Sequence, residues 1–115
     1  MPDTPMQQAV LNAEELEMAF GKDVVQQVWE KAWVISTNDP NIWRKDECGA
    51  WIRREHYANR DSEFGWEINH VPPGDPDDVS TLRALHWRNN VHTGVGRLRC
   101  KVKADAEGMR NGEAS

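Results

Sequence analysis

The chain has 115 residues, a net charge of −5, 38% hydrophobic and 29% charged residues, and six tryptophans. This length supports one domain with a core and is too short for two. No apolar run approaches the roughly 18 residues of a membrane span, and no basic-plus-apolar leader indicates secretion. We therefore expect a cytoplasmic, soluble domain with an aromatic core and no membrane association.

Two helices are predicted in the N-terminal third, after a flexible tail at 1–11. Asn12 is typical of an N-cap, and the acids that follow it favour a short helix ending near Gly21. A second helix is expected over 22–34, because apolar residues recur there at helical spacing. We interpret this stripe as core rather than as a ligand site; it consists of Val25, Val28, Trp29, Ala32 and Trp33.

The middle of the chain is predicted to form short strands joined by turns. The residues at 38–41 have the composition of a turn. Within 42–57, Gly49 favours a turn between two short strands, which predicts a small hairpin. The segment 59–65 is a polar loop.

The stretch from Gly65 to Thr93 carries the most informative pattern. A strand is expected over 66–71, followed by a loop rich in Pro, Gly and Asp at 72–78. A second apolar run at 82–87 leads into a helix that begins at 88–92. The predicted order is therefore strand, loop, strand and helix, with His70 and Asn90 facing one another across the unit.

The C-terminal part is predicted to contain one more strand. Over 96–102, apolar residues alternate with basic ones, which is the period of a half-buried strand. The residues 104–115 are expected to form a flexible tail. Cys48 and Cys100 lack the CxxC spacing of a zinc site, so two reduced thiols are the default expectation, although the sequence does not exclude a disulfide.

Charge is distributed unevenly along the chain. The first 35 residues contain six acids against two lysines, whereas 82–103 contains no acid at all. This asymmetry is either incidental on a solvated surface or marks a basic face that follows a phosphate backbone. The candidate nucleic-acid-binding residues on that face are Arg83, Arg88, Arg97, Arg99, Lys101 and Lys103.

The chain resembles small, single-domain HNH endonucleases over residues 24–94. The resemblance is carried by the elements W-R-K-D at 43–46, G-x-W-I at 49–52 and G-W-E-I-x-H at 65–70, and by the strand, loop, strand and helix described above. It implies an α+β fold, in which N-terminal helices and a small β-hairpin accompany a ββα-metal unit. We expect this HNH-like domain to occupy 12–103.

The resemblance also implies a site for Mg²⁺ or another divalent cation. His70 would be the general base that activates water, Asn69 takes the position of the acidic metal ligand, and Asn90 would be the ligand on the helix. Thr81 takes the position of an asparagine that orients the histidine. Thr93 takes the place of a helix residue that is often basic and holds phosphate.

Three of these positions depart from the family pattern. Asn69 is neutral where hard cations favour an anionic oxygen, Thr81 lacks the carboxamide, and Thr93 lacks the charge. An aspartate of the connecting loop (Asp75, Asp77 or Asp78) is a conceivable substitute ligand, and loop composition explains these residues equally well. We interpret His86 as a packed or hydrogen-bonded residue of the second strand, and Asn89 as an alternative helix cap.

Two functions follow as hypotheses. In the first, an HNH scaffold with a decayed metal site binds nucleic acid, DNA rather than RNA, or a partner protein, as a phage-type inhibitor of a host nuclease would. In the second, the protein is an active, metal-dependent endonuclease or nickase in which His70 is the general base.

Overall fold

The computed structural model describes residues 20–71, 78–94 and 97–114. These residues form a mixed α+β fold with two helices, two short 3₁₀ turns and three two-stranded antiparallel sheets. The helices are α3 (Lys22–Trp29) and α4 (Trp87–Thr93), and the 3₁₀ turns are η1 (Arg54–His56) and η2 (Val79–Thr81). The sheets pair β1 (Trp43–Lys45) with β2 (Trp51–Arg53), β3 (Trp66–His70) with β4 (Leu82–His86), and β5 (Val102–Ala104) with β6 (Asn111–Glu113). The predicted tail at 1–11 and nearly all of the helix expected from Asn12 lie outside the described residues.

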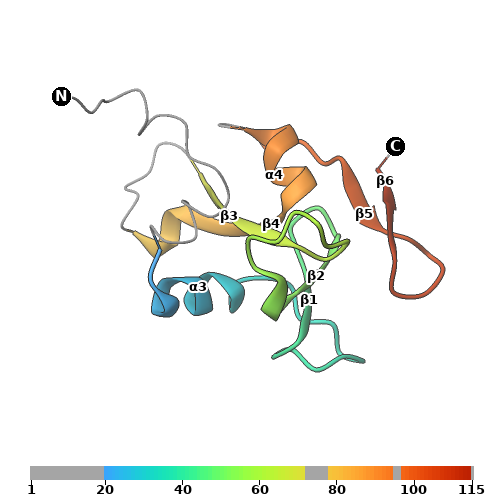
Figure 1. Ribbon diagram of the computed structural model, residues 1–115, viewed down its shortest axis with the longest axis horizontal. Helices are drawn as coiled ribbons and strands as arrows, with labels where there is room; N and C mark the ends of the chain where they lie inside the picture. The colour runs from blue at the N-terminus through green and yellow to red at the C-terminus, as the bar shows by residue number, and fades with distance from the viewer. Residues whose placement is uncertain (1–19, 72–77, 95–96, 115) are drawn as a thin grey trace.

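The β3–β4 hairpin lies at the centre, with α3 on one side and α4 on the other (Figure 1). Side chains alternate between the two faces of a strand, so the hairpin contributes to both sides. On the α3 side, Trp66 and Ile68 join the apolar core, together with Leu82 and Ala84 from β4. The order strand, strand and helix is therefore present as predicted, whereas residues 72–77 of the predicted loop lie outside the described residues.

Helix α3 supplies the other half of this core. Val25, Val28 and Trp29 are buried, and the rings of Trp29 and Trp66 lie 5.3 Å apart. The helix ends at Trp29 rather than near residue 34. Trp33 instead pairs with Lys45 of β1 and is 49% exposed, so its assignment to the core was wrong.

The hairpin predicted around Gly49 is confirmed as β1 and β2. Gly49 has a φ of +83°, which glycine adopts without steric cost. The Oδ1 of Asp46 accepts hydrogen bonds from the backbone N–H groups of Cys48 and Ala50, and these bonds hold the turn. Behind the hairpin, the buried Arg44 donates to the backbone carbonyls of Glu30, Ala32 and Pro40.

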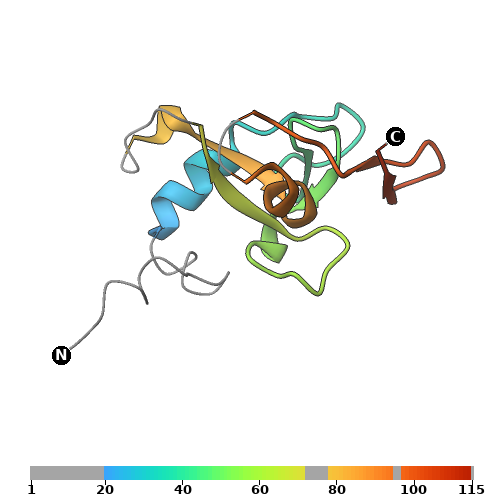
Figure 2. The same ribbon diagram turned by 90° about the horizontal axis from the view of Figure 1, so that it is seen from above.

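The C-terminal segment differs from the prediction. The strand expected at 96–102 is β5 at Val102–Ala104, and it pairs with β6 in the segment that was predicted to be a flexible tail. This hairpin projects from one end of the molecule (Figure 2). The Asn111 side chain fixes it to β2, since its Oδ1 accepts from Trp51 N at 2.8 Å and its Nδ2 donates to Trp51 O at 3.0 Å.

A disulfide between Cys48 and Cys100 joins the β1–β2 turn to the segment before β5. The default expectation of two reduced thiols was therefore wrong. The two cysteines are 52 positions apart, and nothing in the local sequence pattern pairs them. Within the described ranges, no helix is both long and apolar enough to cross a membrane.

Candidate functional site

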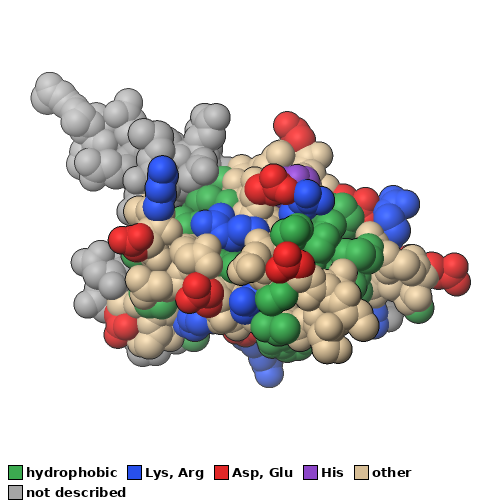
Figure 3. Space-filling model, turned by 90° about the horizontal axis from the view of Figure 1, so that it is seen from below, with side chains coloured by type: hydrophobic (Ala, Val, Ile, Leu, Met, Phe, Trp, Pro, Cys, Tyr) green, Lys and Arg blue, Asp and Glu red, His purple; other side chains and the backbone are tan. Residues whose placement is uncertain are grey.

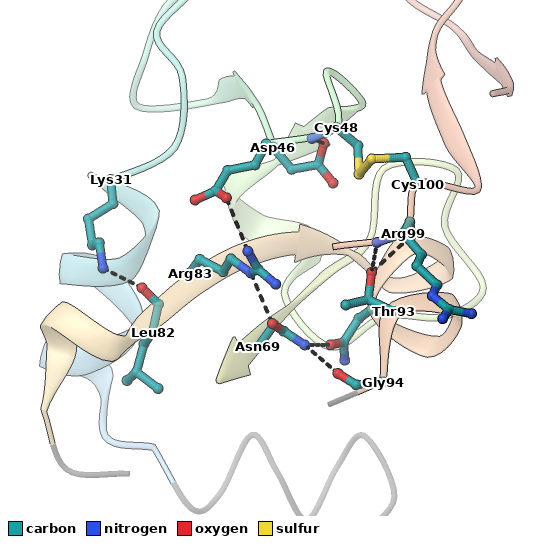
Figure 4. A network of polar contacts seen from close by, with 12 residues as sticks. Lys31, Asp46, Cys48, Asn69, Leu82, Arg83, Thr93, Gly94, Arg99 and Cys100 are labelled. Carbon is teal, nitrogen blue, oxygen red and sulfur yellow. Dashed lines mark hydrogen bonds and ion pairs between the residues drawn. A yellow bond between two sulfur atoms is a disulfide. The ribbon is translucent and has the colours of Figure 1, made fainter. Parts of the chain in front are cut away.

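The candidate site lies between the β3–β4 hairpin and α4. Asn69 and Arg83 stand opposite one another in the strand register, and Arg83 Nε donates to Asn69 Oδ1 at 2.9 Å (Figure 4). Both residues are buried, with 5% and 9% exposure. The same guanidinium reaches Glu47 at 3.3 Å through Nη1, whereas its buried Nη2 has no hydrogen-bond partner among the described residues. A fixed positive charge therefore stands beside Asn69.

Hydrogen bonds continue from Asn69 across the site in one direction. Asn69 Nδ2 donates to Asn90 Oδ1 at 2.8 Å, and Asn90 Nδ2 donates to Glu67 Oε1 at 2.8 Å. Arg60 completes the series with a bidentate ion pair to Glu67, at 2.5 and 2.8 Å, and this pair raises the pKa of Arg60. We call this set, Arg83, Asn69, Asn90, Glu67 and Arg60, the amide network.

The residues of the amide network do not fit a divalent cation in this arrangement. The oxygens that Asn69 and Asn90 would offer to a metal both accept hydrogen bonds from side-chain nitrogens. The guanidinium of Arg83 adds a charge that repels a cation. Among the residues that the structure describes, no group of three or more His, Cys, Asp or Glu is arranged to hold a metal ion.

Glu67 and Arg60 are the members of the network that the sequence analysis missed. Glu67 lies two positions before Asn69 on β3, so both side chains face α4. It is 2% exposed and supplies the carboxylate of the amide network. The period of the strand was a usable signal for Glu67, but no local pattern indicates its pairing with Arg60.

His70 lies on the other face of the hairpin. Its ring is 5.9 Å from that of Phe20, which packs against the core on the α3 side. The prediction that His70 and Asn90 face one another does not hold, because adjacent strand residues point to opposite faces. The Nε2 of His70 is buried and has no hydrogen-bond partner among the described residues.

Thr81 and Thr93 make local contacts to the backbone. The hydroxyl of Thr81 donates to the Asp78 carbonyl at 2.8 Å, next to the start of β4. Thr93 is buried, and its hydroxyl donates to Arg99 O and accepts from Arg99 N, both at 2.9 Å (Figure 4). Thr93 thus fixes the chain that leaves α4. Of the loop aspartates, Asp75 and Asp77 lie outside the described residues.

His86 is the last residue of β4, as predicted, and it caps α4. Its Nδ1 accepts from Arg88 N at 3.1 Å, so the proton is on Nε2, which donates to Glu63 O at 2.7 Å. The ring is 2% exposed, and burial lowers the pKa of His86. These contacts give His86 a structural role.

Asn89 does not cap the helix but lies fully buried beside Asp46. Its Nδ2 donates to Asp46 Oδ2 at 2.9 Å and to Val102 O at 3.0 Å. Its Oδ1 accepts from the backbone N–H groups of Lys101 and Val102, at 2.6 and 2.8 Å. Burial raises the pKa of Asp46, and hydrogen bonds from Asn89 and from backbone N–H groups oppose that rise. This pair joins the β1–β2 hairpin, α4 and β5.

The predicted basic face is only partly assembled. Arg83 belongs to the buried network and cannot serve as a surface contact, which corrects its assignment. Arg88 and Lys101 each form an ion pair with Glu113 at 3.2 Å. Arg97, Arg99 and Lys103 are exposed. A hollow of about 330 Å³ includes the paired Arg88 and Lys101 and is lined by Trp87, Arg88, Val91, His92 and Lys101.

Comparison of the chain with models of protein families, with curated proteins and with solved structures found no match.

Proposed function

We propose that this protein binds nucleic acid, DNA rather than RNA, through an HNH-like ββα unit, and that it does not cleave what it binds. The observation that supports the absence of cleavage is the hydrogen bond from the buried Arg83 to Asn69 Oδ1 at 2.9 Å. A guanidinium in that place repels a divalent cation. It also uses the oxygen that a metal would need.

The surface for nucleic acid would be the segment that follows α4. Arg97, Arg99 and Lys103 are exposed there, and Thr93 fixes the Arg99 backbone against the end of the helix. Lysine and arginine contacts to phosphate release counterions, so binding through this surface should weaken steeply with salt.

Fluorescence anisotropy with a labelled duplex at several salt concentrations tests the binding. Arg99→Gln should weaken binding and reduce the salt slope by about 1. Lys22→Gln, which removes one exposed charge at the start of α3, is the matched control and should change little. Equal effects of the two variants, or no duplex binding at low salt, would contradict the proposal and direct attention to a protein partner, such as a host nuclease.

Calorimetric titration of Mg²⁺ and Mn²⁺ tests the role of Arg83. Asn69→Asp alone should not create a metal site, because the new carboxylate would pair with Arg83. The double variant Asn69→Asp/Arg83→Gln removes that cation and should gain saturable binding. Saturable binding by the unaltered protein would overturn the proposal.

The second candidate is a working endonuclease or nickase, and Glu67 is the observation that favours it. This carboxylate lies on the α4 side and its Oε1 is 2.8 Å from Asn90 Nδ2, so the network contains one anionic side chain. Plasmid cleavage that requires added Mg²⁺ and is lost in both His70→Ala and Glu67→Gln would establish the enzyme. Cleavage that persists in both variants would indicate a contaminating nuclease.

A further inference from the structure

One face of the β1–β2 hairpin carries aromatic and cationic side chains in alternation. Of its three tryptophans, Trp33 is exposed, Trp43 is half-buried and Trp51 is buried. Residues directly opposite in a sheet project from the same face. Lys45 lies between Trp33 on one side and Trp51 on the other, and in the next row Trp43 is opposite Arg53. We call these five residues the hairpin face.

The cations are held against the rings. Lys45 Nζ lies 4.7 Å from the ring centroid of Trp51, and the Arg53 guanidinium carbon lies 5.1 Å from that of Trp43. Such cation–π contacts keep long side chains extended along the sheet, which reduces the entropy lost when a ligand fixes them. Arg53 also pairs with Glu55 at 2.6 Å. Within the described residues, Lys45 has no ion pair, so its charge is available to an anion.

Part of this surface is open. Trp33 is 49% exposed, and the apolar residues Val34 and Ile42 are 56% and 37% exposed. The space-filling view from the side of α3 and β1 shows hydrophobic side chains with Lys and Arg side chains among them (Figure 3). Trp33 thus offers an open ring face next to Lys45, which is the combination that an unpaired base and its phosphate require.

We infer that the hairpin face binds single-stranded nucleic acid, with an unpaired base stacked on Trp33 and the adjacent phosphate held by Lys45. Aromatic platforms interleaved with cations are the usual means of holding single strands without sequence preference. In a duplex the base faces are covered by neighbouring bases, so Trp33 would find no stacking partner there. This inference goes beyond the proposed function, because it uses a different surface and a different form of nucleic acid.

Two other occupants fit the hairpin face less well. A second copy of the chain, related by a two-fold axis, would bring Lys45 and Arg53 close to the same cations of its partner, and like charges oppose that contact. An acidic peptide would satisfy the cations, but it would leave the exposed faces of Trp33 without a stacking partner.

The experiment is anisotropy of a labelled oligothymidylate of about 12 nucleotides with the full chain at low salt. Trp33→Ala should weaken binding by at least about 5-fold, and Trp33→Phe should retain most of it. Lys45→Gln should reduce the salt slope by about 0.7. Val34→Ala, which truncates an equally exposed apolar neighbour, is the matched control and should change binding by less than about 2-fold.

Each outcome decides the inference. Loss of binding in Trp33→Ala with recovery in Trp33→Phe supports stacking. The single-strand surface is also distinguishable from the proposed duplex surface, because Arg99→Gln should leave oligothymidylate binding largely unchanged. No oligothymidylate binding, equal losses in Trp33→Ala and Val34→Ala, equal competition by polyglutamate, or a dimer in sedimentation that Trp33→Ala dissociates would each overturn it.

Discussion

Replacing Asn89 with alanine tests the buried polar centre of the fold. The side chain makes four hydrogen bonds, which join α4 to Asp46 and to the backbone that enters β5. At a net contribution of roughly 1 kcal/mol each, their loss should lower the free energy of unfolding by about 4 kcal/mol. The neighbouring Asn90 is half-buried and makes two, so Asn90→Ala should cost about 1–2 kcal/mol.

Urea unfolding of the oxidised protein, followed by tryptophan fluorescence, measures both variants. Six tryptophans give a strong signal, and unchanged m-values would show that the two-state comparison is valid. The reasoning would be refuted if Asn89→Ala lost less than about 1 kcal/mol, or no more than Asn90→Ala. Such a result would mean that the surrounding backbone finds other partners once the amide is removed.

Three further predictions concern the disulfide, a buried histidine and a glycine. Replacing Cys48 and Cys100 with serine opens a loop of 52 positions and should lower the free energy of unfolding by about 4 kcal/mol. Urea unfolding measures this loss, and an unchanged midpoint would contradict a disulfide in the native protein. Burial lowers the pKa of His86 below its ordinary value of 6.5. The stabilising contribution of the neutral ring is therefore present above pH 6.5 and is lost as the pH falls through the lowered pKa. Thermal unfolding between about pH 7.5 and 5.5 should show a smaller pH dependence in His86→Gln than in the wild type. A Cβ on Gly65 would stand 1.8 Å from a backbone oxygen, so Gly65→Ala should lower the free energy of unfolding by about 3 kcal/mol. Gly21 has nothing within 4 Å of such a Cβ, so Gly21→Ala should change it by less than about 0.5 kcal/mol in the same denaturation assay.

Local sequence patterns were sufficient to predict the helix and strands that bury one face. The stripe of Val25, Val28 and Trp29 predicted α3, and Gly49 predicted the β1–β2 turn. The order of β3, β4 and α4 followed from the run that contains His70 and Asn90. These signals are short in range, because periodicity and turn chemistry are set by neighbouring residues.

Long-range contacts account for what the sequence did not predict. Asn111 binds Trp51 from sixty positions away, and this contact converts an expected tail into part of a sheet. The Cys48–Cys100 disulfide depends equally on the assembled fold. In the site, the pairing of Asn69 with Arg83 is set by the strand register, which fixes partners only once β3 and β4 are aligned.

Asn69, where the HNH resemblance would place an acid, is matched to its partners in the amide network. Donation runs from Arg83 through Asn69 and Asn90 to the carboxylate of Glu67. An aspartate at 69 would have no proton to donate to Asn90 Oδ1. Turning the Asn90 amide to correct this would remove its donation to Glu67. The neutral Asn69 and the cationic Arg83 therefore depend on one another, which favours a completed polar network over a metal site that has merely lost one ligand.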